Sequence, residues 1–321
     1  MTGKKAAAAF SHIDLFRSGI ISAVFILPVL FGQLGWLRIL IPLPAFYFLL
    51  TYGWQKGNTY ITTGVLTAGA ISLLMGGMAD FLVSCTLLPV GYVLAKASRE
   101  KYSINNAGLH ASVTLTITWC ACVFIIGLFS HTNPYTETLT AIDGIIASSV
   151  ELYQQSSELS DETAYQLQKA IEQIRQIIPV IFPALLLITV AITVWINIIA
   201  GIWLLKKQGN QDLCCWTEYS QWRLPDQLVW VVIASGGSLM LPAQLISRIG
   251  LNILLVSGTL YFFQGLAVLS FLLRKWAVPR PFQIFIYVLV CVQAYGMFFL
   301  AIFGLLDVWI DFRKDRQEIT D

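Results

Sequence analysis

The sequence predicts an all-α membrane protein: a polytopic transmembrane helical bundle of eight or nine membrane segments with an extracytoplasmic amphipathic helical hairpin. Hydrophobic residues make up 57% of its 321 residues and charged residues only 12%, with a mean hydropathy of +0.71, whereas soluble domains carry about 25% charged residues. Long apolar runs such as Ile181 to Ile192 do not alternate with polar residues, as the strands of a membrane barrel would. The lipid bilayer is therefore the expected surrounding of this chain.

A helix needs about 20 apolar residues to cross roughly 30 Å of hydrocarbon, and nine segments approach that length. They are Phe16–Trp36, Leu37–Tyr52, Thr59–Met78, Asp80–Ala95, Leu109–Phe129, Ile177–Leu205, Leu228–Leu241, Ile249–Leu273 and Phe282–Leu306. The seventh is short enough to be a half-helix or a re-entrant piece. This leaves eight or nine spans, and it leaves the side of the C-terminus open.

A polar segment, His131 to Gln176, separates the fifth apolar segment from the sixth. Leu139, Ile142 and Ile146 recur in it at helical spacing, and so do Ile171 and Ile174, which predicts two amphipathic helices. One interpretation is a solvated connector, and the other is an external lid over a binding cavity. We expect three parts: a five-helix membrane half (1–130), this external segment (131–176) and a second membrane half with a charged tail (177–321).

Orientation follows from Lys and Arg in short loops, which are in excess on the cytoplasmic side. A cytoplasmic N-terminus leaves few basic residues outside through the first six spans: Arg38, Lys169 and Arg175. It places the larger set in the cytoplasm: Lys4, Lys5, Arg17, Lys56, Lys96, Arg99, Lys101, Lys206, Lys207 and Arg223. The sequence therefore predicts a cytoplasmic N-terminus and an external polar segment.

Small residues recur four apart on the third segment: Gly64, Ala68, Ser72 and Gly76. Such a face lets two helix backbones approach closely in lipid. It is either a packing face within the chain or a docking face for another membrane subunit.

Polar residues inside apolar helices usually face a cavity or a partner helix, and the last two segments carry two such stripes. The candidate residues on the eighth segment are Asn252, Ser257, Tyr261 and Gln264, and the last three of these share one helix face. The candidate residues on the ninth segment are Gln293, Asp307 and Asp311, and Gly296 and Gly304 lie on roughly the same face as they do. The two carboxylates, one turn apart, are candidates for a cation or proton path. The alternative is a helix end neutralised by Arg313 and Lys314.

Enzyme chemistry has little support in the sequence. The histidines His12, His110 and His131 are scattered among different segments, without the spacing of a metal site. No phosphate-binding glycine loop and no nucleophile elbow is present. We therefore expect no catalytic residue, no metal, no cofactor, no disulfide and no nucleic-acid partner.

Several short motifs occur in a set order along nearly the whole chain. They are Pro42-Leu43-Pro44 with Gly53 and Gly57; Trp222-Arg223-Leu224-Pro225; Gly250-Leu251-Asn252; Gln264-Gly265; and Gly304, Asp307 and Asp311-Phe312-Arg313-Lys314. In this ordered set the sequence resembles the YybS-like family of bacterial polytopic membrane proteins, whose N-terminal half is similar to the substrate-capturing S-components of energy-coupling factor transporters.

The resemblance implies a multi-pass protein of the bacterial cytoplasmic (inner) membrane that binds an unidentified small solute. It also implies a separate ATPase and transmembrane coupling module as partner. The rival hypothesis is a non-transporting membrane scaffold or assembly factor that binds partner membrane proteins.

Overall fold

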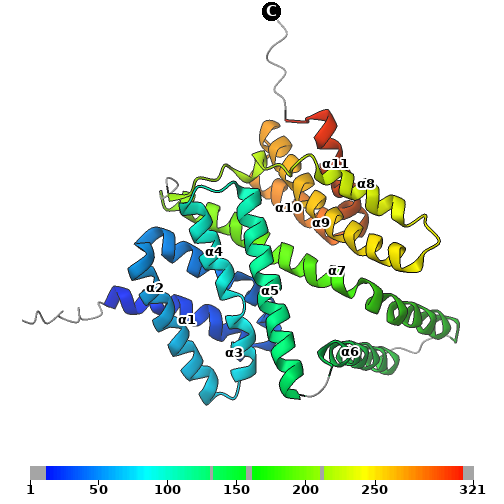
Figure 1. The fold of residues 1–321 in the computed structure, drawn as a ribbon, viewed down its shortest axis with the longest axis horizontal. Coiled ribbons are helices and arrows are strands. Elements are labelled where there is room, and N and C mark those ends of the chain that lie inside the picture. The colour runs from blue at the N-terminus through cyan, green and yellow to red at the C-terminus, as the bar shows by residue number, and fades with distance from the viewer. Residues whose placement is uncertain (1–11, 131–132, 157–160, 210–212, 314–321) are drawn as a thin grey trace, which may run out of the picture. The chain divides into compact units, whose positions relative to one another are not determined.

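The structure, a computed structural model, describes residues 12–130, 133–156, 161–209 and 213–313. Every regular element within these ranges is a helix (Figure 1). The all-α prediction is therefore confirmed for the described residues.

Six helical stretches in the described ranges are long and apolar enough to cross a membrane. They are His12–Leu30, Gly32–Leu74, Met78–Arg99, Ile104–Phe129, Tyr165–Lys207 and Gln244–Lys275. A sharply bent pair near the C-terminus raises the number to seven if it counts as one span, and Leu228–Ser238 is a shorter apolar helix. By length and composition the chain thus has six or seven spans, and the eight or nine predicted are not reproduced.

The first difference lies in the second and third predicted segments. After α1 (His12–Leu30) and the 3₁₀ helix η1 (Gly32–Leu40), both belong to α2 (Pro42–Leu74), which is broken at Gly53. Gly53 has φ 77°, a left-handed conformation that glycine adopts without steric cost. Beyond the break, a Cβ on Gly57 would lie 2.7 Å from the Phe48 carbonyl oxygen. The two arms of α2 therefore fold back closely on each other.

The fourth predicted segment, Asp80–Ala95, consists of two helices, α3 (Met78–Cys85) and α4 (Leu88–Arg99). Pro89 stands in the first turn of α4, where its missing N–H removes no helical hydrogen bond. Such a proline favours a new helix start over a continuous span. The next helix, α5 (Ile104–Ser130), contains the fifth predicted segment.

The polar segment between the fifth and sixth predicted spans contains α6 (Pro134–Ser156) and the beginning of α7 (Asp161–Lys207). The second predicted amphipathic helix is not separate, because α7 runs on without interruption into the sixth predicted span. Its two internal prolines, Pro179 and Pro183, mark the change from the polar part to the apolar part.

The seventh and eighth predicted segments correspond to α8 (Leu228–Ser238) and α9 (Gln244–Lys275), which follow the short 3₁₀ helix η3 (Tyr219–Gln221). The ninth is broken into α10 (Arg280–Val292) and α11 (Ala294–Ile310), bent by 104°. Gln293 between them is extended, with φ −94° and ψ 121°. The expectation that Gln293 and Asp307 share a face of one straight helix is therefore wrong.

The chain divides into two compact units, and each is described by itself. The first comprises Met1–Thr118 with Val190–Glu218, and the second comprises Trp119–Thr189 with Tyr219–Asp321. Both α5 and α7 contribute residues to both units. The three consecutive parts expected from the sequence stay a prediction.

In the first unit, α1 packs against α2 through small and hydroxyl side chains. The Ser22 hydroxyl donates to the Gly64 carbonyl oxygen at 2.9 Å, and the Ser18 and Thr63 hydroxyls lie 2.7 Å apart. A Cβ on Gly64 would lie 2.8 Å from the Ser18 carbonyl oxygen. The absence of a side chain at Gly64 therefore permits this close approach.

Gly64 is one of four small residues spaced four apart in the sequence, and the other three, Ala68, Ser72 and Gly76, differ in their surroundings. Ala68 and Ser72 are buried and lie on the same helix face as Gly64. Gly76 lies beyond the end of α2 with φ 74°, and the N–H of Gly77 donates to the Ser72 carbonyl oxygen at 2.9 Å. Gly76 thus terminates the helix in the left-handed conformation typical of a C-terminal glycine.

Residues 213–218, which follow α7, belong to the first unit and pack within it. Trp216 stacks on Phe46 with a centroid distance of 5.7 Å, and its indole N–H donates to the Tyr102 carbonyl oxygen at 2.9 Å.

The neighbouring Cys214 is a free thiol, and burial raises its pKa. The thiol therefore stays protonated at neutral pH, where it is a poor nucleophile.

The core of the second unit is α9, which packs against α8, α11 and η3. Glycines bring α9 and α11 close together: a Cβ on Gly265 would overlap the Leu300 backbone, and one on Gly304 would overlap the Tyr261 backbone. This contact carries polar side chains from both helices into the interior of the unit.

Candidate functional site

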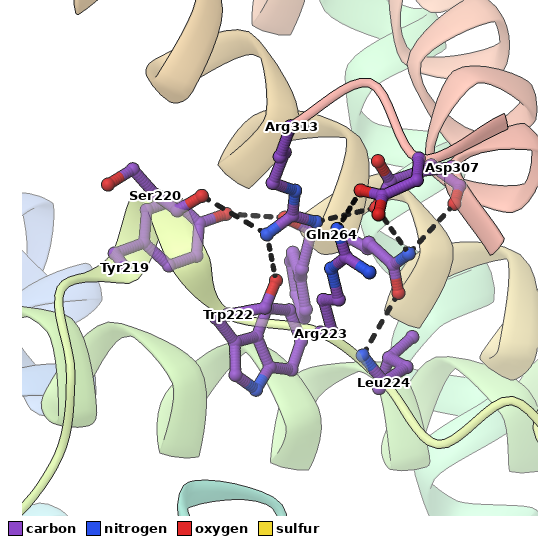
Figure 2. Close-up of polar contacts among 11 residues, drawn as sticks. Tyr219, Ser220, Trp222, Arg223, Leu224, Gln264, Asp307 and Arg313 are labelled. Carbon is purple, nitrogen blue, oxygen red and sulfur yellow. Dashed lines mark hydrogen bonds and ion pairs between the residues drawn. The ribbon is translucent and has the colours of Figure 1, made fainter. Parts of the chain in front are cut away.

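A buried ion pair lies at the C-terminal end of α11 (Figure 2). Asp307 is 1% exposed, and its Oδ2 accepts a hydrogen bond from Arg313 Nη2 at 2.7 Å. Asp311 ends the helix with φ 45°, and this left-handed residue turns the chain so that Arg313 reaches back to Asp307. Two opposite charges are thereby removed from solvent together.

The same guanidinium holds the segment that precedes α8. Arg313 Nη1 donates to the carbonyl oxygens of Ser220 and Trp222 at 3.1 and 2.8 Å (Figure 2). That segment contains an arginine of its own, Arg223, which pairs with Asp311. This pair is accessible to solvent, since the Arg223 side chain is 45% exposed and the Asp311 side chain is 28% exposed. Residues 219–224 are therefore tied to the end of α11 by two arginines.

Gln264 on α9 completes this network. Its Nε2 donates to the Gly304 carbonyl oxygen at 3.0 Å and to Asp307 Oδ2 at 3.1 Å, and its Oε1 accepts from the Leu224 N–H at 3.0 Å. A side-chain amide has both donors and acceptors. Gln264 can therefore bond to a carbonyl group, a carboxylate and an N–H group at the same time while 1% exposed.

The structure separates several residues that the sequence groups together. Asp307 and Asp311 do not share one partner, because each pairs with its own arginine. Ser257 is buried and donates to the Ile253 carbonyl oxygen of its own helix at 2.8 Å. Tyr261 is buried in a cluster with Leu224 and Val229. Gln264, by contrast, contacts two residues of the stripe predicted on the ninth segment, Gly304 and Asp307.

Asn252, also on α9, bonds to α7 where Pro183 interrupts its hydrogen bonding. Its Oδ1 accepts from the Ala184 N–H, and its Nδ2 donates to the Val180 carbonyl oxygen, each at 2.8 Å. In a regular helix these two backbone groups would bond to each other. The Asn252 amide is inserted between them, so both groups keep a partner at the proline.

We predict that Asn252→Leu lowers the free energy of unfolding by about 1–3 kcal/mol, because both backbone groups lose their partner inside an apolar environment. Combining it with Pro183→Ala restores an N–H to α7 and lets the helix close its own bonds. The double variant should therefore be more stable than Asn252→Leu alone. Unfolding of both variants in detergent mixtures measures this, and equal stability would contradict the role of Asn252.

The sequence offers Arg313 as a partner that neutralises the helix end, but it predicts no role in the site for Arg223 or Asn197. Arg223 and Arg313 complete the network of the second unit. In the first unit, Asn197 on α7 is fully buried and donates to the Ile39 and Thr193 carbonyl oxygens, each at 2.7 Å. The sequence could have indicated this residue, because an asparagine within an apolar membrane segment usually faces a partner or a cavity.

A cavity of about 280 Å³ lies between α6 and α7 in the second unit. Its apolar lining comes from Leu139, Ile142, Ile146, Ile178 and Pro179, and its polar lining comes from Thr140, Asp143 and Arg175. Arg175 Nε lies 2.6 Å from Asp143 Oδ1, and the two side chains are 47% and 54% exposed. The cavity therefore combines an apolar wall with an accessible pair of opposite charges.

Metal binding has no geometric support in the part of the chain that the structure describes. No group of three or more His, Cys, Asp or Glu side chains gathers there at a distance suited to a metal ion.

Six apolar helical stretches of membrane-crossing length define the chain as a helical, multi-pass membrane protein. Residues 19–308 match a family described as "Predicted membrane protein (DUF2232)", and because this match spans most of the chain, the chain belongs to that family. Comparisons with curated proteins and with solved structures find no match.

Proposed function

We propose that this chain is the solute-binding subunit of a membrane transport system, with the cavity between α6 and α7 as its external binding site. The observation that carries the proposal is that cavity, which joins an apolar wall to the Asp143–Arg175 pair. Ligand sites are usually mainly apolar clefts with a few polar groups that orient the ligand.

Two further arguments support the proposal. The excess of Lys and Arg in the loops favours a cytoplasmic N-terminus. Because α2 is broken at Gly53 and its two arms fold back on each other, we count Gly32–Leu74 as two crossings. Five crossings then precede α6, so α6 and the first part of α7 lie outside the bacterial inner membrane. The resemblance of the N-terminal half to S-components supports energy supply by a separate ATPase module, since the sequence has no phosphate-binding loop of its own.

Within this proposal, the network around Asp307 holds the second unit together and does not conduct ions. Its carboxylate bonds to Arg313 and Gln264, so a passing cation would have to displace a guanidinium. Asn252 has the same kind of role at the proline of α7.

Uptake measurements test the proposal. Cells with and without the protein are compared for uptake of radiolabelled amino acids, vitamins and metal ions, and the tagged protein is purified to identify bound subunits. We expect uptake of one solute class that depends on the protein, together with co-purification of an ATPase pair. Bound partner proteins without any change in uptake would contradict transport.

That outcome would favour the second candidate, a membrane scaffold or assembly factor. One observation supports it: Asn252, Gln264 and Asp307 all form hydrogen bonds within the second unit. Polar side chains used in this way stabilise a rigid membrane protein that presents surfaces to partners.

A further inference from the structure

The charges in the cavity between α6 and α7 restrict what it can bind. Arg175 uses Nε to reach Asp143 Oδ1 at 2.6 Å. Among the described residues, the other two nitrogens of the guanidinium and the second carboxylate oxygen stay available to a ligand. Both side chains are about half exposed, so a ligand can reach them from solvent. A ligand that carries one charge would meet an attractive and a repulsive partner together.

The size and wall of the cavity restrict the rest of the ligand. Its volume of about 280 Å³ lies just below the roughly 300–1,000 Å³ usual for small-molecule sites. Leu139, Ile142 and Ile146 from α6 and Ile178 from α7 form its apolar wall. A compact ligand with an apolar side chain fits this wall, and a large or strongly polar ligand does not.

We infer that this cavity binds a small zwitterion with an apolar side chain, of the α-amino acid class. The ligand carboxylate pairs with Arg175, its ammonium group pairs with Asp143, and its side chain lies against the isoleucines. Both protein charges then gain a second partner of opposite sign, so neither is left facing a like charge. The inference rests on the proposed function, because it names the class of solute for that site.

Ligand binding to the purified full-length protein in lipid nanodiscs tests this inference. L-leucine is compared by isothermal titration with isopentylamine, which lacks the carboxylate, and with 4-methylpentanoate, which lacks the ammonium group. We expect L-leucine to bind at least about tenfold more tightly than either analogue, because each analogue loses one charged contact. Equal affinity of all three compounds, or no binding of L-leucine, would overturn the inference.

Matched variants locate the site. Arg175→Gln and Asp143→Asn should each weaken L-leucine binding by about tenfold or more. Lys169→Gln and Glu137→Gln make the same charge changes at exposed positions of the same two helices outside the cavity, and they should leave binding unchanged. An exposed ion pair contributes little to folding, so the cavity variants should remain folded. Unchanged binding in both cavity variants would contradict the assignment.

The two proposals fail in different ways. Protein-dependent uptake of another solute, with no binding of L-leucine, would overturn the amino acid inference and support transport. Binding of L-leucine that depends on Arg175 and Asp143, without any uptake, would support the inference and contradict the transport function.

Discussion

Replacing Arg313 with Gln should lower the free energy of unfolding by about 3–5 kcal/mol, the usual cost of leaving one member of a buried ion pair without its partner. The Arg313 and Asp307 side chains are 6% and 0% exposed. Asp307 Oδ1 and Arg313 Nε have no hydrogen-bond partner in the described residues, so each charge depends strongly on the other. The variant also removes two bonds to the 219–224 segment.

The chain offers a matched control in the exposed pair Arg223–Asp311. Arg223→Gln removes the same kind of charge from a partner in the same unit, but exposed pairs contribute only about 0.2–1 kcal/mol. Unfolding of both variants in mixtures of SDS and mild detergent gives the comparison. If Arg313→Gln were no more destabilising than Arg223→Gln, the buried pair would not stabilise the second unit.

A double-mutant cycle separates the pair from the other bonds of Arg313. Asp307→Asn with Arg313→Gln removes both charges, so no uncompensated charge remains buried. We expect the double variant to be more stable than the sum of the two single changes predicts. Strict additivity would show that the two side chains do not interact.

Replacing Gly64 with Leu should destabilise the first unit by about 3 kcal/mol or more, which exceeds the cost of most point substitutions. A Cβ at this position would lie 2.7 Å from Ile21 Cβ and 2.8 Å from the Ser18 carbonyl oxygen. The backbone oxygen cannot rotate away as a side chain can, so α1 and α2 must separate. Their separation would also break the hydrogen bond from Ser22 to the Gly64 carbonyl oxygen.

Gly19→Leu is the control for this prediction. Gly19 lies on α1 next to Ser18, but a Cβ placed there meets no other part of the described chain within 4 Å. Yield of monodisperse protein and unfolding in detergent measure both variants. Equal behaviour of the two variants would mean that the stripe containing Gly64 is not a packing face within the chain.

The apolar segments could be predicted because their length and composition follow directly from the bilayer. Their breaks could not. Gly53 breaks α2 while Gly64 lies within the same helix, and a glycine in the sequence does not reveal which conformation its surroundings require. At Gln293 no proline marks the change of direction, and α10 and α11 contact each other across the bend.

Of the candidate site, too, only a part could be predicted from the sequence. The sequence placed Arg313 close to Asp307 and Asp311, so a charge interaction at this helix end could be expected. In the structure Arg313 pairs with Asp307, and Arg223 pairs with Asp311. This choice of partners depends on how residues 219–224 pack against α11, and the local sequence does not determine that tertiary contact. For the cavity, the stripe of Leu139, Ile142 and Ile146 predicted a helix, but not that Arg175 lies opposite Asp143.

We propose that α6 lies outside the membrane of a multi-pass protein whose N-terminus is cytoplasmic. Labelling of single cysteines in intact cells tests it, in a variant whose six native cysteines are replaced. A membrane-impermeant maleimide should label Glu137→Cys on α6 in intact cells, and it should label Arg99→Cys at the end of α4 only after the cells are permeabilised. Labelling of Arg99→Cys but not of Glu137→Cys in intact cells would contradict the proposed orientation and the external binding site.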